Sequence, residues 1–450
     1  MIHKFAQGGL YFVLDVDSGA IHMVEEIVFD ALDYYPAQSA VDTVKRLLDK
    51  YEEKEIKEAI SEIDELIENE LLYAKQLFSV APDFKRTVKA LCLNVAHDCN
   101  MRCKYCFASQ GEYEGARHLM PFEVGKAAFD FLVKGSEGRR NLEVDFFGGE
   151  PLMNFGVVKQ LVAYGRELEV KHNKHFRFTI TTNGLLLDDE KIDYINEHMD
   201  NVVMSLDGRK EINDSMRPLP GGGGTHDLII PKFKRLIEKR GDKMYYLRGT
   251  FTADNADFFE DVKHMAGLGF ENISVEPVVT EPSKPYALRE NQLEEIFAQY
   301  EALAEDLANR RDYNFFHFNV NFDQGPCMIK RISGCGAGLD YLAVTPTGDI
   351  YPCHQFVGND EFKLGDVFNG ISPEMLEKVE KFGKASALEK EECKSCWAKY
   401  YCSGGCHANA YNMNADIMVP YRMGCKMEKK RIECGIYLYG KRKLEELEAE

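Results

Sequence analysis

The sequence lacks several features that would place it in a common class. It has no run of roughly eighteen apolar residues, which excludes a membrane-spanning helix. Its start, MIHKF, lacks the basic and apolar segments of a signal peptide, so we expect a cytoplasmic protein. Basic residues are in deficit, 55 against 74 acidic, and the net charge of -19 argues against nucleic-acid binding.

What is present is a globular composition with many cysteines. The 450 residues are 45% hydrophobic and 29% charged, enough for two or three packed domains. There are 13 cysteines, an odd number, and none lies between Cys106 and Cys327. Since a reducing compartment disfavours disulfides, two separate cysteine clusters indicate two metal-binding regions.

Residues 1–80 read as a small module. Apolar segments at 10–14 and 20–24 flank a turn with Gly19 and predict a hairpin. Three helices are expected: one from Glu25 to Tyr34, a second from about Ala40 with Ser39 as its N-cap, and a third from Lys54 to Leu72. Strands followed by three helices suggest a winged helix. Its acidic helices argue against DNA binding, which leaves an inert scaffold or another recognition role.

Residues 88–310 alternate strand and helix patterns, which predicts an α/β fold with parallel strands, either an open sheet or a partial barrel. In such folds the chemistry lies at the carboxyl ends of the strands. Residues 314–425 have short strands and dense cysteines, so metal should supply what the core lacks. Residues 426–450 look like an exposed charged helix. The glycine-rich loop 220–225 lacks the Lys-Ser/Thr of a phosphate loop and is expected to be flexible. The strands are expected at 88–94, 142–147, 176–181, 202–206, 246–251 and 273–277.

Directly after the first of these strands come Cys99, Cys103 and Cys106. Three thiolates in one loop can hold three irons of a four-iron cluster and leave the fourth iron open to a ligand. Zinc is the alternative, although zinc sites more often show two CxxC pairs.

This CxxxCxxC loop resembles the signature of the radical S-adenosylmethionine (SAM) superfamily. Phe147-Gly148-Gly149-Glu150-Pro151, Thr181-Thr182-Asn183-Gly184 and Met204-Ser205-Leu206-Asp207-Gly208 match that family's SAM-contacting strand ends. The resemblance implies a partial (β/α)6 TIM-like barrel in which a 5'-deoxyadenosyl radical abstracts hydrogen from the substrate. It also implies SAM contacts by Tyr105, Gly148, Gly149, Glu150, Asn183, Ser205 and Arg217, and catalytic cluster ligation by Cys99, Cys103 and Cys106.

The later cysteines match the seven-cysteine pattern of the SPASM extension found on radical SAM peptide-modifying enzymes. The resemblance implies two auxiliary clusters and hence three [4Fe-4S] clusters in all. Cys393, Cys396, Cys402 and Cys425 would hold the second auxiliary cluster, and Cys335, Cys353 and Cys406 the first. Cys327 either is a further ligand of the first auxiliary cluster or binds no cluster. His407 could replace one of the thiolate ligands, but this is less favoured. Cys92 and Cys434 are expected to be buried thiols. A zinc ribbon is the alternative for this region.

The whole layout resembles maturases of ribosomally made peptides, most of all the sactisynthase-like maturases of cysteine-rich SCIFF peptides. That resemblance implies thioether formation between a cysteine sulfur and a carbon of another residue. It also implies a precursor peptide bound through its leader at the N-terminal module, which would add a strand to the small sheet. An electron donor such as flavodoxin or ferredoxin is implied too. The alternatives are a sulfatase-maturase type dehydrogenase of serine or cysteine, carbon–carbon crosslinking, peptide epimerisation and a metal-stabilised binding protein.

Overall fold

The computed structural model describes residues 1–76, 87–113, 115, 117–323, 332 and 334–449. The chain begins with an antiparallel sheet in the order β1-β2-β3, followed by three helices. The expected hairpin is confirmed, with Gly19 at a φ of +77°, and Ser39 caps its helix by accepting from the Asp42 N–H. Strand β1 was not predicted. The elements are β1 (Ile2–Gln7), β2 (Leu10–Asp15), β3 (Ile21–Val24), α1 (Glu26–Ala31), α2 (Ala40–Leu47) and α3 (Glu53–Glu68).

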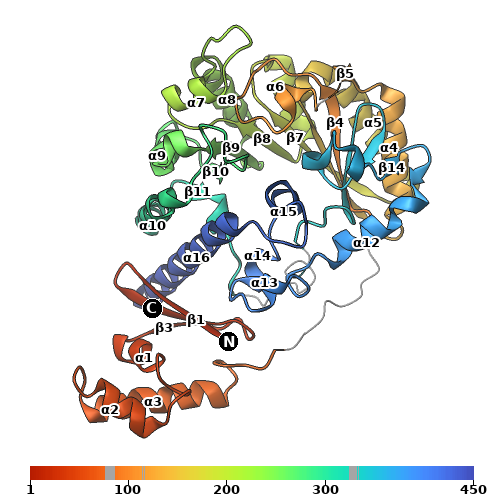
Figure 1. Ribbon diagram of the computed structural model, residues 1–450. Helices are drawn as coiled ribbons and strands as arrows, with labels where there is room; N and C mark the ends of the chain where they lie inside the picture. The colour runs from red at the N-terminus through yellow and green to blue at the C-terminus, as the bar shows by residue number, and fades with distance from the viewer. Residues whose placement is uncertain (77–86, 114, 116, 324–331, 333, 450) are drawn as a thin grey trace.

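This N-terminal module, residues 1–76, shares a core with the rest of the chain. Val13 packs with α1, α2 and α3 in a core of the module's own, whereas Phe12 and Leu14 belong to the main core. The alternation of a strand explains the difference, because neighbouring side chains point to opposite faces. In Figure 1 the module lies at the bottom, beside the C-terminal helix. The architecture contains the strands and helices expected of a winged helix, and that description of it stays a prediction.

All six predicted strands of residues 88–310 are present and run parallel in chain order. The predicted α/β class with a mostly parallel central sheet is therefore confirmed. The strands are β4 (Ala90–His97), β6 (Asn141–Gly148), β7 (His175–Thr182), β8 (Asn201–Ser205), β9 (Tyr245–Phe251) and β10 (Asn272–Pro277). The helices are α4 (Phe122–Gly135), α5 (Phe155–His172), α6 (Asp189–His198), α7 (Lys210–Met216), α8 (His226–Arg240), α9 (Phe258–Gly267) and α10 (Leu293–Asn309).

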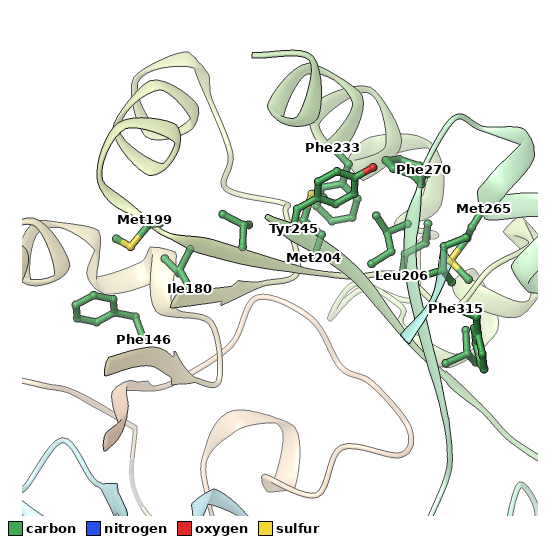
Figure 2. Packing of buried hydrophobic residues seen from close by; sticks show 14 of the residues in the cluster. Phe146, Ile180, Met199, Met204, Leu206, Phe233, Tyr245, Met265, Phe270 and Phe315 are labelled. Atoms are coloured by element: carbon green, nitrogen blue, oxygen red, sulfur yellow. The ribbon is translucent and has the colours of Figure 1, made fainter. Parts of the chain in front are cut away.

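The main core lies between these strands and their helices (Figure 2). Phe146, Ile180 and Met204 reach into it from three neighbouring strands, and Phe233 and Met265 come from helices. All five side chains are completely buried. The next residues along these strands, Phe147, Thr181 and Ser205, face the other side of the sheet.

Both edges of this sheet are extended by later parts of the chain. Strand β11 (Asn314–Phe315) pairs in parallel with β10, and β12 (Tyr341–Val344) pairs in parallel with β4. Antiparallel strands β13 (Asp349–Tyr351), β14 (Gly365–Asp366) and β15 (Gly370–Ile371) continue from β12, and β5 (His118–Leu119) pairs with β4. The cysteine-rich region thus continues the sheet that carries the first cysteine loop.

The remaining helices are short except the last. They are α12 (Leu376–Lys384), α13 (Glu391–Lys394), α14 (Lys399–Cys402), α15 (His407–Asn414) and α16 (Arg422–Ala449). Short 3-10 helices lie in the connections, among them η5 (Phe316–Phe318) and η6 (His354–Phe356). Over the described residues, no helix combines the length and apolar character that a membrane crossing needs.

The predicted C-terminal helix is confirmed, but the expectation that it is exposed along its whole length is wrong. Helix α16 starts at Arg422 and runs along the N-terminal module (Figure 1), and a stretch around residues 432–440 is largely buried. Gly440 permits this close packing, because a Cβ there would lie 2.5 Å from Phe12. Charged residues flank this stretch on both sides, so the apolar residues within it did not indicate burial in the sequence.

Candidate functional site

The loop after β4 carries the first three cysteines, and backbone hydrogen bonds fix it in place. The Arg102 N–H donates to the Pro218 carbonyl at 2.9 Å, and the Lys104 N–H donates to the Met216 carbonyl at 2.9 Å. Burial raises the pKa of Cys99 to about 12 and that of Cys103 to about 11. Buried thiols of this kind ionise only when a positive charge compensates, which is what a metal centre supplies.

Gly148 and Gly149, at the end of β6, let this strand approach the cysteine loop. A Cβ on Gly148 would lie 2.3 Å from the Ala96 carbonyl oxygen, and one on Gly149 would lie 2.1 Å from that of Asp98. Gly148 also has a φ of +131°. The resemblance to radical SAM enzymes assigned both glycines to contact with SAM. The structure adds a second reason, because two strand-end loops touch at these residues.

Glu150 lies behind the glycines and is buried, with 1% of its surface exposed. Its carboxylate accepts from the Leu152 N–H at 3.0 Å, the Thr182 hydroxyl at 2.8 Å and the Asn183 N–H at 2.8 Å. Burial raises its pKa to about 7. A carboxylate has about four acceptor sites, so one remains for a further donor, and a cationic donor would stabilise the ionised form.

Asn183 directly follows β7, and its side chain makes two kinds of contact. Its oxygen accepts from the Leu185 N–H at 3.1 Å, which stabilises the turn after the strand. Its amide nitrogen donates to the Asn100 side chain at 2.8 Å and lies 3.7 Å from the Cys99 sulfur. The ends of β4, β6 and β7 are thereby joined around one thiol.

Tyr105 and Arg217 belong to a buried network with Asp207, a residue not singled out from the sequence. The Tyr105 hydroxyl donates to Asp207 at 2.7 Å and accepts from Arg217 at 2.7 Å. The Nε of Arg217 is buried and has no partner among the described residues. Ser205 ends β8 and faces Arg248 of β9 in the strand register. The network therefore holds an unused cationic donor beside the cysteine loop.

Four of the later cysteines surround one cavity. Cys393, Cys396, Cys402 and Cys425 line a space of about 90 Å³ together with residues of α14 and α16. Burial raises the pKa of Cys393 to about 11, and Cys425 and Cys396 add to the effect. The structure thus brings together the four residues that the resemblance assigned to one cluster.

The other set is also assembled. Burial raises the pKa of Cys353, and the neighbouring thiols of Cys406 and Cys335 raise it further. Cys353 is buried, whereas Cys335 and Cys406 are exposed, so this set opens outward. Cys327 lies outside the described residues.

His354, directly after Cys353, connects this set to the first cysteine loop. Its ring lies 5.4 Å from that of Phe107, the residue after Cys106, and 5.2 Å from that of Phe147, the residue before Gly148. The Tyr341 hydroxyl lies 3.1 Å from its Nδ1. The open cysteine set and the loop of Cys106 are therefore neighbours.

The donor set consists of thiols, which are the ligands of iron–sulfur clusters, and a cubane needs one thiolate on each iron. Over the part of the chain that the structure describes, no three His, Cys, Asp or Glu side chains converge on a single ion. Cys92 and Cys434 are buried as expected, and His407 is buried with its Nδ1 3.5 Å from the ammonium of Lys390.

Comparisons with known proteins agree with this arrangement. Residues 93–266 match the radical SAM superfamily, and residues 335–397 match SPASM, an iron–sulfur cluster-binding domain. A cysteine-type anaerobic sulfatase-maturating enzyme of Clostridium perfringens is 26% identical over 331 residues, 68% of this chain and 85% of that protein.

Two solved structures share the fold. The anSMEcpe enzyme with bound AdoMet and the Cp18Cys peptide has a TM-score of 0.65 at 21% identity and covers 78% of this chain and 98% of its own. Streptococcus suis SuiB, solved with S-adenosylmethionine and with the precursor peptide SuiA, reaches 0.54 at 16% identity in the SAM-bound structure. That structure covers 93% of this chain and 97% of its own.

The chain therefore contains a radical SAM domain and a SPASM domain, and it is homologous to anaerobic sulfatase-maturating enzymes. SAM and iron–sulfur clusters are the cofactors of these domains.

Proposed function

We propose that this enzyme forms a thioether between a cysteine sulfur and a carbon of another residue in a ribosomally made, cysteine-rich precursor peptide. The observation that carries the proposal is the outward-opening cysteine set beside the radical site. Cys335 and Cys406 are exposed, and His354 links Cys353 to the loop of Cys106. A substrate thiol bound at this set would lie next to the place where hydrogen is abstracted.

In the proposed assignment Cys99, Cys103 and Cys106 ligate the catalytic cluster. When bound there, the cluster and SAM supply a 5'-deoxyadenosyl radical. Glu150 accepts from the ammonium group of SAM with its remaining acceptor site, and the free Nε of Arg217 suits the carboxylate. Asn183 and Ser205 take the carboxylate or ribose. Tyr105 holds Arg217 against Asp207, and the SAM contact expected of Tyr105 stays a prediction.

The auxiliary ligands divide as the cysteine sets do. Cys393, Cys396, Cys402 and Cys425 hold a fully ligated cluster, for which the enclosed cavity is support. Cys335, Cys353 and Cys406 hold the other and leave a position for the substrate cysteine, unless Cys327 fills it. Thiolate binding there lowers the pKa of the substrate cysteine. A total of three [4Fe-4S] clusters follows from this proposal.

Crosslinking breaks one C–H and one S–H bond of the peptide and forms one C–S bond. The hydrogen atom from carbon leaves in 5'-deoxyadenosine, and the thiol proton goes to solvent. One electron remains, and clusters held by the two auxiliary cysteine sets would accept it. Flavodoxin or ferredoxin is proposed as the external donor that starts the reaction.

The N-terminal module is proposed to bind the leader of the precursor as an added strand of its sheet. Two observations support this role. The SuiB structure covers 93% of this chain, and the uncovered remainder is shorter than the N-terminal module. The fold that the two proteins share therefore extends into the module. The sheet has three strands, and each of its outer strands, β1 and β3, has one edge that is not hydrogen-bonded to another strand of this sheet.

The test incubates the anaerobically reconstituted enzyme with SAM, a reductant and a cysteine-rich precursor encoded near its gene. We expect a peptide lighter by two hydrogens with one thiol fewer per crosslink, seen by mass spectrometry with and without thiol alkylation. A two-hydrogen loss with all thiols retained would indicate carbon–carbon crosslinking, and an unchanged mass with altered chirality would indicate epimerisation. Either result would refute thioether formation.

A second candidate is dehydrogenation of a serine or cysteine in a protein, favoured by the homology to sulfatase-maturating enzymes. This reaction creates a carbonyl that hydrazide reagents trap, whereas a thioether does not react. A sulfatase peptide and the cysteine-rich precursor, offered in the same assay, decide between the two.

A further inference from the structure

Lys390 is a buried cation between the two auxiliary cysteine sets. It precedes α13, and none of its surface is exposed. Its ammonium donates to the Gly404 carbonyl at 2.8 Å, and the Nδ1 of His407 lies at 3.5 Å. Within the described part of the chain, no carboxylate lies within 4.0 Å of it. Since burial of an unpaired charge is costly, another anion is required to compensate it.

Segments of both sets meet at this ammonium. Gly404, which accepts from it, lines the cavity with Cys393, Cys402 and Cys425, and His407 directly follows Cys406 of the open set. These four thiols and the more distant carboxylate of Asp416 interact with it electrostatically. A cubane with four thiolates carries a net charge of about −2 and gains a further negative charge on reduction. Lys390 therefore lies where two anionic clusters would flank it, and they would supply the missing counter-charge.

A second buried lysine shows what is unusual about this one. Lys399 has 1% of its side chain exposed and also lines the cavity, but it is paired with Asp17 at 3.6 Å. Lys399 thus has a carboxylate within ion-pair distance, whereas none of the described carboxylates lies that close to Lys390 and Asp416 acts on it only from further away.

We propose that Lys390 is a fixed counter-cation of the auxiliary iron–sulfur clusters that makes their reduced states easier to reach. This inference rests on the proposed function, because it presupposes clusters at both sets. A nearby positive charge stabilises the form with the extra electron and so raises the reduction potential. The auxiliary clusters then become better acceptors for the electron that crosslinking releases.

The experiment is a redox titration of the full-length reconstituted enzyme, followed by electron paramagnetic resonance. The signal of the catalytic cluster is identified by its response to SAM. Lys390→Gln removes the charge and keeps a donor for the Gly404 carbonyl, and Lys390→Arg keeps the charge. Lys394→Met is the matched control, because it removes the same charge from an exposed residue of α13 that is paired with Glu391.

We expect Lys390→Gln to lower the ratio of reduced to oxidised auxiliary cluster roughly tenfold at a fixed ambient potential. For a one-electron couple this corresponds to about 59 mV toward more negative potential. Lys390→Arg and Lys394→Met should titrate like the parent enzyme. Full iron loading of Lys390→Gln with an unchanged potential would overturn the inference.

Loss of the clusters is also informative. If Lys390→Gln and Lys390→Met lose auxiliary iron while Lys390→Arg retains it, charge compensation is required for assembly and the inference stands. If Lys390→Arg loses it as well, shape rather than charge matters and the inference is wrong. A parent enzyme that assembles only the catalytic cluster would instead refute the proposed function.

Discussion

Gly149→Ala tests whether the meeting of two strand ends builds the catalytic site. The added methyl group would lie 2.1 Å from the Asp98 carbonyl oxygen and 2.6 Å from its carbon. Both are backbone atoms and cannot rotate away, so one loop has to move. Two hydrogen bonds join these loops, from the Gly149 N–H to Ala96 at 2.7 Å and from the Glu150 N–H to Asp98 at 2.9 Å.

The cost can be estimated from these contacts. Forced overpacking costs about 1–3 kcal/mol, and loss of the two hydrogen bonds adds about 1 kcal/mol each. The total of about 3–5 kcal/mol falls on the loop that carries Cys99. Because about 1.4 kcal/mol is a factor of ten, we expect retention of the catalytic cluster to fall more than 100-fold.

The assay counts iron and acid-labile sulfide after anaerobic reconstitution and measures 5'-deoxyadenosine. We expect iron to fall from about twelve to about eight per chain, since the auxiliary sites are untouched, and SAM cleavage to be lost. The control is Gly156→Ala in α5, where a Cβ meets nothing within 4 Å and alanine favours the helix. A Gly149→Ala enzyme with full iron and parent-like cleavage would show that this contact does not build the site.

Further substitutions test other parts of the structure. Changing Cys99, Cys103 and Cys106 together to Ala should abolish 5'-deoxyadenosine formation and leave auxiliary iron in place; retained cleavage would refute the assignment. Phe12→Ala should destabilise the packing of the N-terminal module on α16 by about 3–5 kcal/mol, seen as faster proteolytic release of that module, because its buried ring packs against Tyr437 at 6.4 Å. Unchanged proteolysis would contradict this packing. Arg431→Met should cost about 3 kcal/mol in urea denaturation, because it removes the partner 3.1 Å from the carboxylate of Glu276. If the stability is unchanged, Arg248, 3.7 Å from that carboxylate, compensates for the loss.

Strands with regular alternation could be predicted from the sequence, and the six parallel strands β4 and β6 to β10 of the central sheet were. Elements without that signal were missed. Strand β12 is four residues long and lies in a cysteine-rich stretch, so nothing local shows that it joins the sheet at β4. The burial of α16 was missed because it depends on residues far away in the chain, such as Phe12, which lies 428 positions before Gly440.

The candidate site was likewise predicted only in part from the sequence. The SPASM resemblance, not spacing, grouped the later thiols, and four of them, Cys393, Cys396, Cys402 and Cys425, line one cavity in the structure. Asp207 was within a recognised motif, but its bond to Tyr105 joins residues 102 positions apart. Lys390 has no sequence signal at all, because a lysine beside acidic residues reads as solvated, and only the fold shows that it is buried.

The contacts of the N-terminal module decide how its proposed role has to be tested. The His3 ring stacks on Trp397 at 3.7 Å, and Asp17 pairs with the buried Lys399; both partners belong to the region of the enclosed cysteine set. Deleting residues 1–80 would therefore uncover Trp397 and leave Lys399 buried without its acid. Loss of peptide modification after such a deletion would not distinguish leader recognition from damage to a cluster site. The intact enzyme should instead be titrated with the full precursor and with the same peptide lacking its leader. At least tenfold weaker binding of the leaderless peptide, with equal SAM cleavage, is expected; equal affinity would refute the recognition role.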